Sequence, residues 1–307
     1  MNDSDKPLPP PFFSIVIPCY NYADYLPRAV NSVTEQAFDG VEILIVDDGS
    51  TDETESVAQS LGEACEDNVL HYLWQENKGA AAARNKGVSA SSGEFILFLD
   101  ADDALILGSL EKIQRFLLQH VETDVLFGGH ISVFQDGREK ASKLKEFSRD
   151  NQENFADYIF KNISVVNGAM VVRREILETI RYNEALRVAE DIPVFALLIA
   201  RYSCSSIGDP LVRVFKHDDS LRHNSRYSAE ANTGVVDEIF GSPLLPEVMQ
   251  KHRQKYRSLR WLSAFRTLYK AGKWEEARRA YLCALSADPR ALLKLRALGR
   301  FLHACFK

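Results

Sequence analysis

The sequence is poor in the features that mark membrane-spanning and secreted proteins. No apolar run approaches the roughly 18 to 20 residues that cross a bilayer. The acidic, proline-rich start MNDSDKPLPPP has neither the basic nor the apolar part of a signal peptide. The cysteines are scattered without a C-x-x-C pair, as is typical of reduced thiols: Cys19, Cys65, Cys204, Cys283 and Cys305. We therefore expect a cytoplasmic protein in which residues 1–11 form a disordered lead-in.

Charge is distributed unevenly along a chain of otherwise ordinary composition. The 307 residues are 46% hydrophobic and 26% charged, which is typical of a soluble globular protein with one large domain or two ordinary ones. Residues 251–307 carry 15 lysines and arginines against 3 acids, a net charge of +12. Because the whole chain carries −6, the remainder carries −18. This division sets the basic C-terminal segment apart from the rest.

Short apolar runs alternate with helical patterns in the first hundred residues. The expected buried strands are residues 12–17, 41–46, 69–74 and 94–99. The expected helices between them are residues 23–37, 50–61 and 80–90, the second beginning at a capping box formed by Ser50 and Glu53. This alternation predicts an α/β fold with a parallel sheet. A polar cluster follows each strand, and ligands bind beyond the carboxyl ends of such strands, so the clusters predict one shared site.

The second half of the chain has a less regular pattern. We expect a helix over residues 106–120, strands over 124–129, 131–134 and 168–174, and a buried helix over 192–202. Further expectations are a polar loop over residues 137–146 and an extended stretch over 206–215 that leads to His217. After Pro246 the sequence becomes helical and basic. This half therefore adds strands and helices without continuing the regular alternation.

The motif FLDADDA, residues 98–104, places Asp100, Asp102 and Asp103 at the end of a buried strand. Carboxylates this close together repel one another unless a cation lies among them. Mg²⁺ is commonly held by one or two carboxylates together with the oxygens of a substrate's phosphates. Two interpretations of Asp103 stay open, because it either shares in this function or is the N-cap of a following helix.

Five motifs stand in one order and at suitable spacing: IPCYNY (17–22), VDDGSTD (46–52), NKGAAAARNKG (77–87), FLDADD (98–103) and AED (189–191). On these motifs, residues 12–220 resemble the family 2 glycosyltransferases. The resemblance implies the GT-A fold, a Rossmann-like mixed α/β sheet flanked by helices, here with a C-terminal α-helical extension. The implied domains are a nucleotide-sugar-binding half (12–104), an acceptor-binding half (105–222) and a basic helical extension (223–307).

The resemblance assigns the binding of a nucleotide-sugar donor to a set of loop residues: Pro18, Tyr20, Asn21, Asp48, Gly79, Arg84 and Asp100. Asp48 matches the carboxylate that accepts from the uracil imide. The alternative is that one of Asp47 and Asp48 only organises the turn, and Asp47 suits this role better. Gly79 allows close approach of the backbone. Arg84 offers a cation to the diphosphate or the base, with a solvated surface arginine as the alternative. The implied donor is a UDP-sugar.

The same resemblance implies a divalent metal, Mg²⁺ or Mn²⁺. Asp102 matches the direct metal ligand, and Asp100 matches a residue that reaches the ribose or the metal. His217 lies where related chains place a late histidine near the metal or the diphosphate, and a solvated surface histidine is the alternative. The metal would neutralise the diphosphate as the nucleoside diphosphate leaves.

The pair Glu190-Asp191 matches the family's E-D motif before a helix. Inverting transfer needs a base that takes the proton from the acceptor hydroxyl as this hydroxyl attacks the anomeric carbon. Asp191 matches that base, and Glu190 matches a residue that orients the acceptor. An ordinary helix-capping pair is the alternative.

The basic extension carries two further patterns. Residues 271–291 resemble the second half of a tetratricopeptide repeat, and residues 256–270 would complete a helical hairpin. Residues 291–307 alternate apolar and basic side chains at helical spacing, so they either contact anionic lipid at the inner membrane face or pack on the protein itself. RSLRW (257–261) fits a short motif of processive members, but without an adjoining membrane span we interpret it as coincidental.

These features together predict an inverting, metal-dependent and non-processive glycosyltransferase with a glycan or lipid-linked acceptor, acting in polysaccharide or glycoconjugate synthesis without a nucleic-acid partner. A sugar-nucleotide pyrophosphorylase would need a glycine-rich basic loop, which IPCYNY does not supply. A non-catalytic nucleotide-sugar-binding or scaffold protein that uses the helical extension is the remaining alternative. The intact acidic motifs argue against it.

Overall fold

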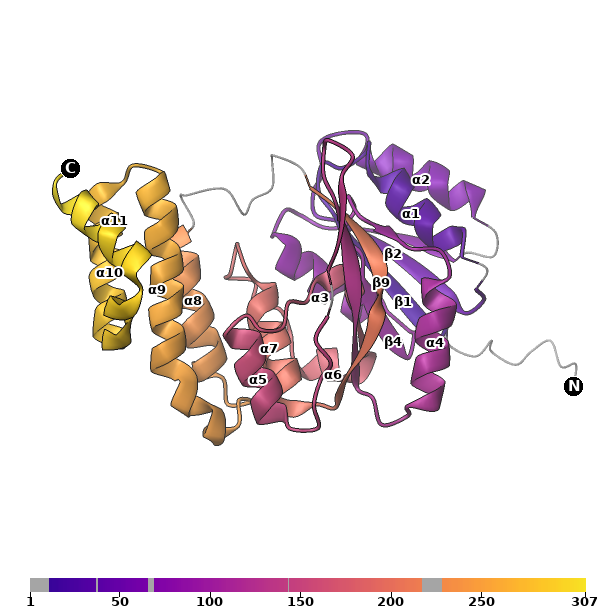
Figure 1. Ribbon diagram of the computed structural model, residues 1–307. Coiled ribbons are helices and arrows are strands. Elements are labelled where there is room, and N and C mark those ends of the chain that lie inside the picture. The colour runs from indigo at the N-terminus through magenta and orange to yellow at the C-terminus, as the bar shows by residue number, and fades with distance from the viewer. Residues whose placement is uncertain (1–10, 37, 66–68, 143, 217–227) are drawn as a thin grey trace, which may run out of the picture. The chain divides into compact units, whose positions relative to one another are not determined.

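The computed structural model describes residues 11–36, 38–65, 69–142, 144–216 and 228–307, with the backbone alone at 228–233. These residues divide into two compact units, each built from separate stretches of chain (Figure 1). The first unit comprises residues 1–147, 165–182 and 203–216, and the second comprises 148–164, 183–202 and 217–307. Apart from Pro11, the expected lead-in lies outside the described residues, as does His217.

One mixed sheet forms the centre of the first unit. Its strands within the described residues are β1 (Phe13–Cys19), β2 (Val41–Asp47), β3 (Leu70–Trp74), β4 (Phe95–Phe98), β5 (Ala104–Leu105), β6 (Val125–Val133), β7 (Glu139–Ser142), β8 (Met170–Arg173) and β9 (Cys204–Phe215). Their order is β3-β2-β1-β4-β8-β6-β9-β5, with β7 beside β6. The first four in this order run parallel, whereas β8 is antiparallel to both of its neighbours. The expected mixed α/β sheet is confirmed.

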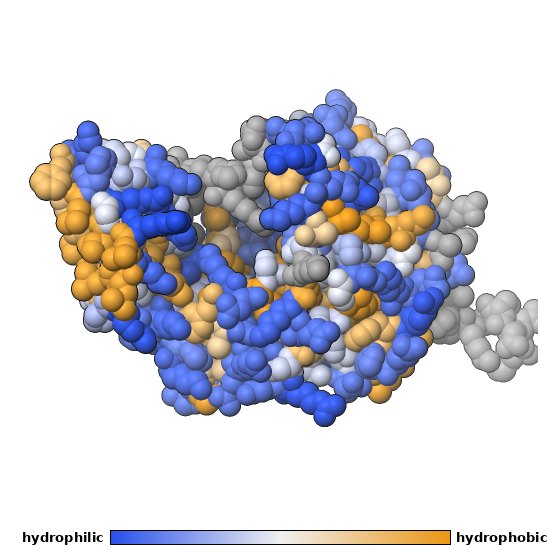
Figure 2. All heavy atoms as spheres, viewed as in Figure 1, coloured by the Kyte–Doolittle hydropathy of each residue, from blue (hydrophilic) through white to orange (hydrophobic). Residues whose placement is uncertain are grey.

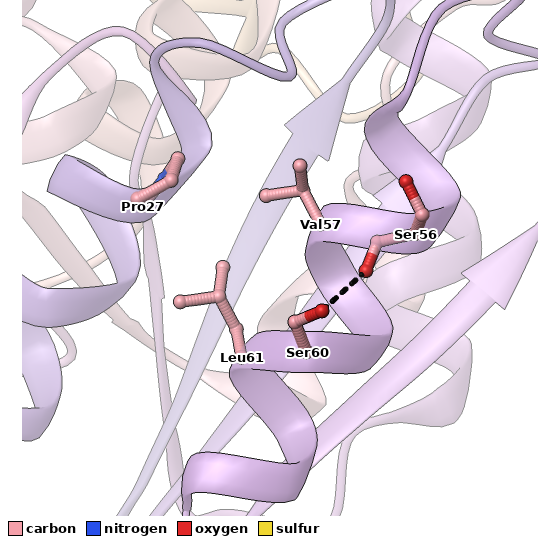
Figure 3. A pocket seen from close by; sticks show the side chains of 5 residues that line it. All are labelled: Pro27, Ser56, Val57, Ser60 and Leu61. Atoms are coloured by element: carbon pink, nitrogen blue, oxygen red, sulfur yellow. Dashed lines mark hydrogen bonds between the residues drawn. The ribbon is translucent and has the colours of Figure 1, made fainter.

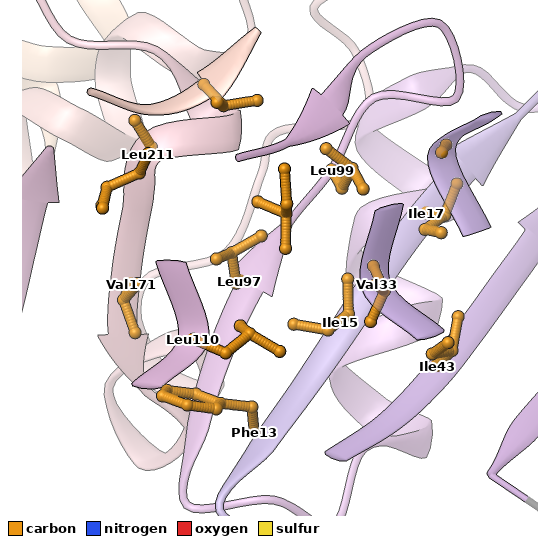
Figure 4. Close-up of a cluster of buried hydrophobic side chains, with 14 of the residues drawn as sticks. Phe13, Ile15, Ile17, Val33, Ile43, Leu97, Leu99, Leu110, Val171 and Leu211 are labelled. Carbon is orange, nitrogen blue, oxygen red and sulfur yellow. The ribbon is translucent and has the colours of Figure 1, made fainter. Parts of the chain in front are cut away.

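Helices cover both faces of this sheet: α1 (Leu26–Thr34), α2 (Thr54–Ala64), α3 (Ala80–Ala90), α4 (Ser109–Gln119) and the short α6 (Arg174–Thr179). Alternate residues of a strand point to opposite faces. Phe13 and Ile15 of β1 therefore join Val33 of α1 in one buried cluster (Figure 4). On the other face, Val16 lies so close to α3 that a Cβ added to Gly87 would stand 2.3 Å from its Cγ1.

Two local predictions in the second half of the sheet are wrong. The expected strands over 124–129 and 131–134 are one strand, β6, whose register with β9 shifts at Gly128 and Gly129. The expected polar loop over 137–146 contains β7, which pairs with β6 in an antiparallel ladder. In both places, pairing with a neighbouring strand overrides a weak local pattern.

The second unit is helical, with α5 (Asn151–Ile159), α7 (Asp191–Arg201), α8 (Ser228–Gly241), α9 (Arg253–Lys270), α10 (Trp274–Ala287) and α11 (Leu295–Cys305). The expected hairpin is present as α9 and α10, which share a buried cluster that includes Phe265 and Tyr281. Within RSLRW, Arg257 pairs with Asp237 at 2.8 Å and Trp261 packs against this cluster. No helix of the described residues is long and apolar enough to span a bilayer.

Candidate active site

The loops that follow β1 and β2 are tied to each other by hydrogen bonds. The amide N–H of Thr51 donates to Oδ1 of Asn21 at 2.8 Å, and the N–H of Asn21 donates to Oγ of Ser50 at 2.9 Å. Asn21 takes the left-handed conformation, with φ 54°, that asparagine tolerates better than most residues. Asn21 therefore holds the first loop against the second. The expected capping box at Ser50 is wrong, because this side chain serves the same tie and α2 begins at Thr54.

Asp48 joins the loop between β3 and α3 to the end of β2 by hydrogen bonds. Its Oδ1 accepts from the side chain of Gln75 at 2.7 Å and from the N–H of Lys78 at 2.8 Å, and its Oδ2 accepts from the N–H of Gly79 at 2.7 Å. A carboxylate has about four acceptor positions. The buried Asp48 thus fixes the loop between β3 and α3 and retains capacity for a ligand's donor.

Asp47 has a different set of donors. Its Oδ1 accepts from the N–H of Ser50 at 2.8 Å, and its Oδ2 accepts from the hydroxyl of Tyr72 at 2.6 Å. Burial and the bond to Asp47 raise the pKa of Tyr72 above its ordinary value, so the phenol keeps its proton. Asp47 organises the turn, as expected from the sequence.

Gly79 stands directly before α3 in a conformation that only glycine adopts readily, with φ 96° and ψ 165°. Its N–H points to Asp48, and the following residues start the helix. A side chain at this position would strain the backbone that Asp48 holds. The glycine therefore allows the loop after β3 to turn directly into α3.

Arg84 of α3 forms an ion pair with Asp100. Its Nη2 lies 2.9 Å from Oδ1 of Asp100, and its guanidinium also lies over the ring of Tyr182, 5.4 Å from the centroid. The side chain of Arg84 is 6% exposed and that of Asp100 is 38% exposed. The alternative of a solvated surface arginine is therefore wrong, since Arg84 is a buried cation beside the loop Asp100 to Asp103, called below the second acidic loop.

Asn85, next to Arg84, makes a two-point contact within the first unit. Its Nδ2 donates to the carbonyl of Tyr182 at 2.8 Å, and its Oδ1 accepts from the N–H of the same residue at 3.0 Å. The hydroxyl of Tyr182 then donates to Asn167 at 3.1 Å. This contact fixes the backbone around Tyr182, a residue that no sequence motif indicates.

Asp103 is bonded to a distant strand. Its Oδ1 accepts from the N–H of Phe215 in β9 at 3.0 Å. The expectation of an N-cap is wrong, because β5 follows directly and α4 begins only at Ser109. Burial raises the pKa of Asp103 to about 8, and the negative charges of Asp100 and Asp102 contribute to this rise. Asp103 is therefore a buried carboxyl that holds its proton more strongly than a solvent-exposed aspartate does.

Asp102 is approached by a cation that the sequence motifs do not mark. The guanidinium of Arg28, in α1, donates to the backbone carbonyl of Asp102 and lies 3.7 Å from the ring centroid of Phe215. Arg28 thus supports the loop through its backbone. The two positions are 74 residues apart, and no local spacing in the sequence connects them.

The described residues contain no group of three or more His, Cys, Asp or Glu side chains that could hold a metal by itself. Mg²⁺ and Mn²⁺ do not require such a group when phosphate oxygens complete the shell. Asp100 and Asp102 carry carboxylate oxygens, the kind of ligand that such cations prefer, beside the buried carboxyl of Asp103. This donor set fits a hard divalent cation that binds together with a diphosphate.

Pro18 and Tyr20 follow the same edge of the sheet. Pro18 lies within β1, paired with Val46 of β2, and Tyr20, just after the strand, is 45% exposed. A surface hollow of about 270 Å³ lies elsewhere in the first unit, between α1 and α2 (Figure 3). Its lining residues are Pro27, Ser56, Val57, Ser60 and Leu61. None of the predicted site residues lines this hollow.

Glu190 and Asp191 belong to the second unit, at the start of α7. Glu190 occupies the N-cap position without a side-chain bond to the helix, so the capping alternative has no support in the hydrogen bonds. Ala189 before it takes the left-handed conformation with φ 62°, which is uncommon for a residue other than glycine. The charge of Asp191 adds to burial in raising the pKa of Tyr256 in α9. Asp191 therefore stands near a buried phenol.

Comparison with known proteins identifies the kind of chain to which these features belong. The sequence pattern of the family described as "Glycosyl transferase family 2" matches residues 14–181. The minor teichoic acid biosynthesis protein GgaA of Bacillus subtilis is 29% identical over 252 residues, 76% of this chain and 54% of GgaA. The GalNAc(5)-diNAcBac-PP-undecaprenol beta-1,3-glucosyltransferase of Campylobacter jejuni is 30% identical over 178 residues, 57% of this chain and 55% of that protein. The chain thus spans about half the length of both relatives.

The fold is also similar to solved structures. A crystal structure of S. aureus TarS 1-349 in complex with UDP-GlcNAc superposes with a TM-score of 0.65 at 20% sequence identity. The match covers 95% of this chain and 88% of that one. At this identity the likeness concerns the fold alone.

Proposed function

The chain belongs to glycosyl transferase family 2, and we propose that it transfers a sugar from a UDP-linked donor to a glycan or lipid-linked acceptor with inversion at the anomeric carbon. The observation that carries the proposal is the second acidic loop, Asp100 to Asp103, at the end of β4. It places three carboxyl groups beside β1, where the order of the parallel strands reverses. Ligands of open α/β sheets bind at such a reversal.

Asp102, with Asp100 beside it, would hold a divalent metal, Mg²⁺ or Mn²⁺. Such a metal supplies a Lewis acid that neutralises the diphosphate of the donor as it departs. The closeness of Asp100, Asp102 and Asp103 in one loop supports this assignment, since such carboxylates repel one another unless a cation lies among them. Asp103 itself supports the loop through its bond to β9.

The nucleotide would be positioned by the loops after β1, β2 and β3. Asp48 accepts from two backbone N–H groups and offers its remaining capacity to the imide of a uracil. The exposed ring of Tyr20 offers a stacking face to the base. Asn21 and Gly79 shape these loops, and Arg84 holds Asp100 in place.

Asp191 would act as the base that takes the proton from the acceptor hydroxyl, with Glu190 orienting the acceptor. Both carboxylates stand at the N-terminal end of α7, where the helix dipole stabilises negative charge. The names of the relatives support an acceptor in cell-envelope or glycoconjugate synthesis, because one is a teichoic acid biosynthesis protein and another acts on an undecaprenol-linked glycan.

The test is hydrolysis or transfer from a panel of UDP-sugars, with Mn²⁺ present and after chelation. We expect Asp102→Ala and Asp191→Asn each to reduce turnover by about a thousandfold or more. Asp209→Asn is the matched control, because this exposed carboxylate only pairs with Lys112 on the surface. Full activity in both site variants would exclude the mechanism. Metal-dependent UDP binding without turnover would instead favour a nucleotide-sugar-binding protein.

A further inference from the structure

Helix α11 has a packed side that fixes it within the second unit. Ala304 is fully buried, and the ring of Phe301 stacks on Tyr281 of α10 with centroids 4.5 Å apart. Arg278 of α10 also donates to the carbonyl of Ala304 at 2.7 Å. The orientation of α11 about its own axis is therefore determined by contacts.

The side of α11 that faces away from these contacts is apolar. Leu295, Leu302 and Phe306 follow at intervals of seven and four residues, so they lie along one stripe of the helix. Leu295 is 77% exposed and Phe306 is 88% exposed. Leu292 and Leu293, in the turn before the helix, are exposed as well. Figure 2 shows this hydrophobic surface at the end of the chain that is yellow in Figure 1.

Basic side chains border this stripe. Arg296 and Lys307 lie about a quarter turn around the helix from the leucines, and Lys294 stands at its start. Arg296, Lys307 and Lys294 are exposed. Residues 289–307 contain no aspartate or glutamate. Apolar and cationic surfaces are thus adjacent on the outward side of one helix.

We propose that this α11 face (Leu292, Leu295, Leu302 and Phe306 with Lys294, Arg296 and Lys307) docks the protein on an anionic lipid bilayer. A bilayer provides both complements at once, since apolar side chains enter the acyl boundary while lysine and arginine remain at negatively charged headgroups. A second copy of the same face would complement the leucines but would bring two cationic borders together, which is unfavourable. The inference concerns attachment and does not depend on the proposed transferase activity.

The experiment is flotation of the full chain with vesicles of phosphatidylcholine alone and of phosphatidylcholine mixed with phosphatidylglycerol, at low and high salt. We expect binding to the anionic vesicles only, weakened by salt. The double variant Leu295→Ser/Leu302→Ser should bind at least about tenfold more weakly. Lys294→Gln/Arg296→Gln should lose roughly fivefold for each charge removed.

The matched control is Leu118→Ser, which replaces an equally exposed leucine of α4 in the first unit and should bind as the unchanged chain does. Circular dichroism and thermal unfolding, both expected to be unaltered in the Leu295→Ser/Leu302→Ser variant, check that this variant is folded. Absence of flotation, equal binding to neutral vesicles, or unchanged binding by the double variant would overturn the proposal. So would conversion of a dimer into a monomer by the same substitutions, because the face would then join two copies.

Discussion

The two acidic loops of the first unit, Asp47-Asp48 after β2 and Asp100 to Asp103 after β4, differ in the groups that bond to their carboxylates. After β2, the side chains of Asp47 and Asp48 accept from backbone N–H groups, an amide and a phenol. After β4, Asp100 is met by one buried arginine, and the pKa of Asp103 rises to about 8. Neutral donors bond both members of the first pair, whereas the second loop has a cation, Arg84, beside Asp100 and a carboxyl, Asp103, whose pKa burial raises. The second loop is thus the one in which a carboxylate already engages a cation, which agrees with the proposed metal site.

Among the substitutions that test this difference between the two loops, Arg84→Gln should have the largest effect on stability and turnover. The substitution removes a buried cation next to Asp100, which is partly solvated, so we expect unfolding free energy to fall by about 2 kcal/mol. Turnover of the donor should fall by at least about tenfold. Chemical denaturation measures the first effect, and added Mn²⁺ should restore more stability to this variant than to the unchanged chain.

Arg115→Gln is the control for that variant. Arg115 pairs with Glu111 on the surface of α4, so its loss should cost less than about 0.5 kcal/mol. If Mn²⁺ stabilises Arg84→Gln no more than it stabilises Arg115→Gln, the metal does not replace the charge of Arg84 beside Asp100.

A smaller effect should distinguish Asp47 from Asp48, the two aspartates of the loop after β2. Asp48→Asn and Asp47→Asn each weaken bonds to buried donors, so both should lose about 1 to 2 kcal/mol of unfolding free energy. Only Asp48→Asn should also weaken UDP binding, by about tenfold, since Asp48 alone is assigned to the base. Titration calorimetry checks the affinities. An equal loss of UDP affinity in both variants would contradict the assignment of Asp48.

The smallest effect should come from Asn85→Ala, which removes the two-point contact with Tyr182. We expect a loss of about 1 to 2 kcal/mol in stability and no more than about a twofold change in the KM of the donor. Asn162→Ala, at an exposed bond to Asp157, serves as the control and should be nearly neutral. A large rise in KM for Asn85→Ala would make Asn85 a donor-binding residue.

The parallel part of the sheet was predictable because its strands are short runs of branched apolar residues between helical patterns. Phe13, Ile15 and Val16 alternate between two packed faces, and a run such as FFSIVI is typical of a strand buried on both sides. The clusters after these strands were predictable for the same reason, since parallel strands end at one edge.

The partners of the acidic loops were not predictable from local patterns. Asp103 binds Phe215, which is 112 positions away, and Arg28 reaches the backbone of Asp102 from another element. Such contacts leave no spacing signal in the sequence. The burial of Arg84 was also missed, because α3 is rich in alanine and packs on more than one side, which erases the contrast between apolar and polar faces.

Metal-dependent binding of UDP tests the assignment of the second acidic loop most directly. Titration calorimetry of the full chain with UDP should show binding with Mn²⁺ and at least about tenfold weaker binding after chelation. Asp102→Asn should bind UDP with the weaker affinity whether or not Mn²⁺ is present. Equal UDP affinity of the unchanged chain with Mn²⁺ and with chelator would contradict the role given to Asp100 and Asp102.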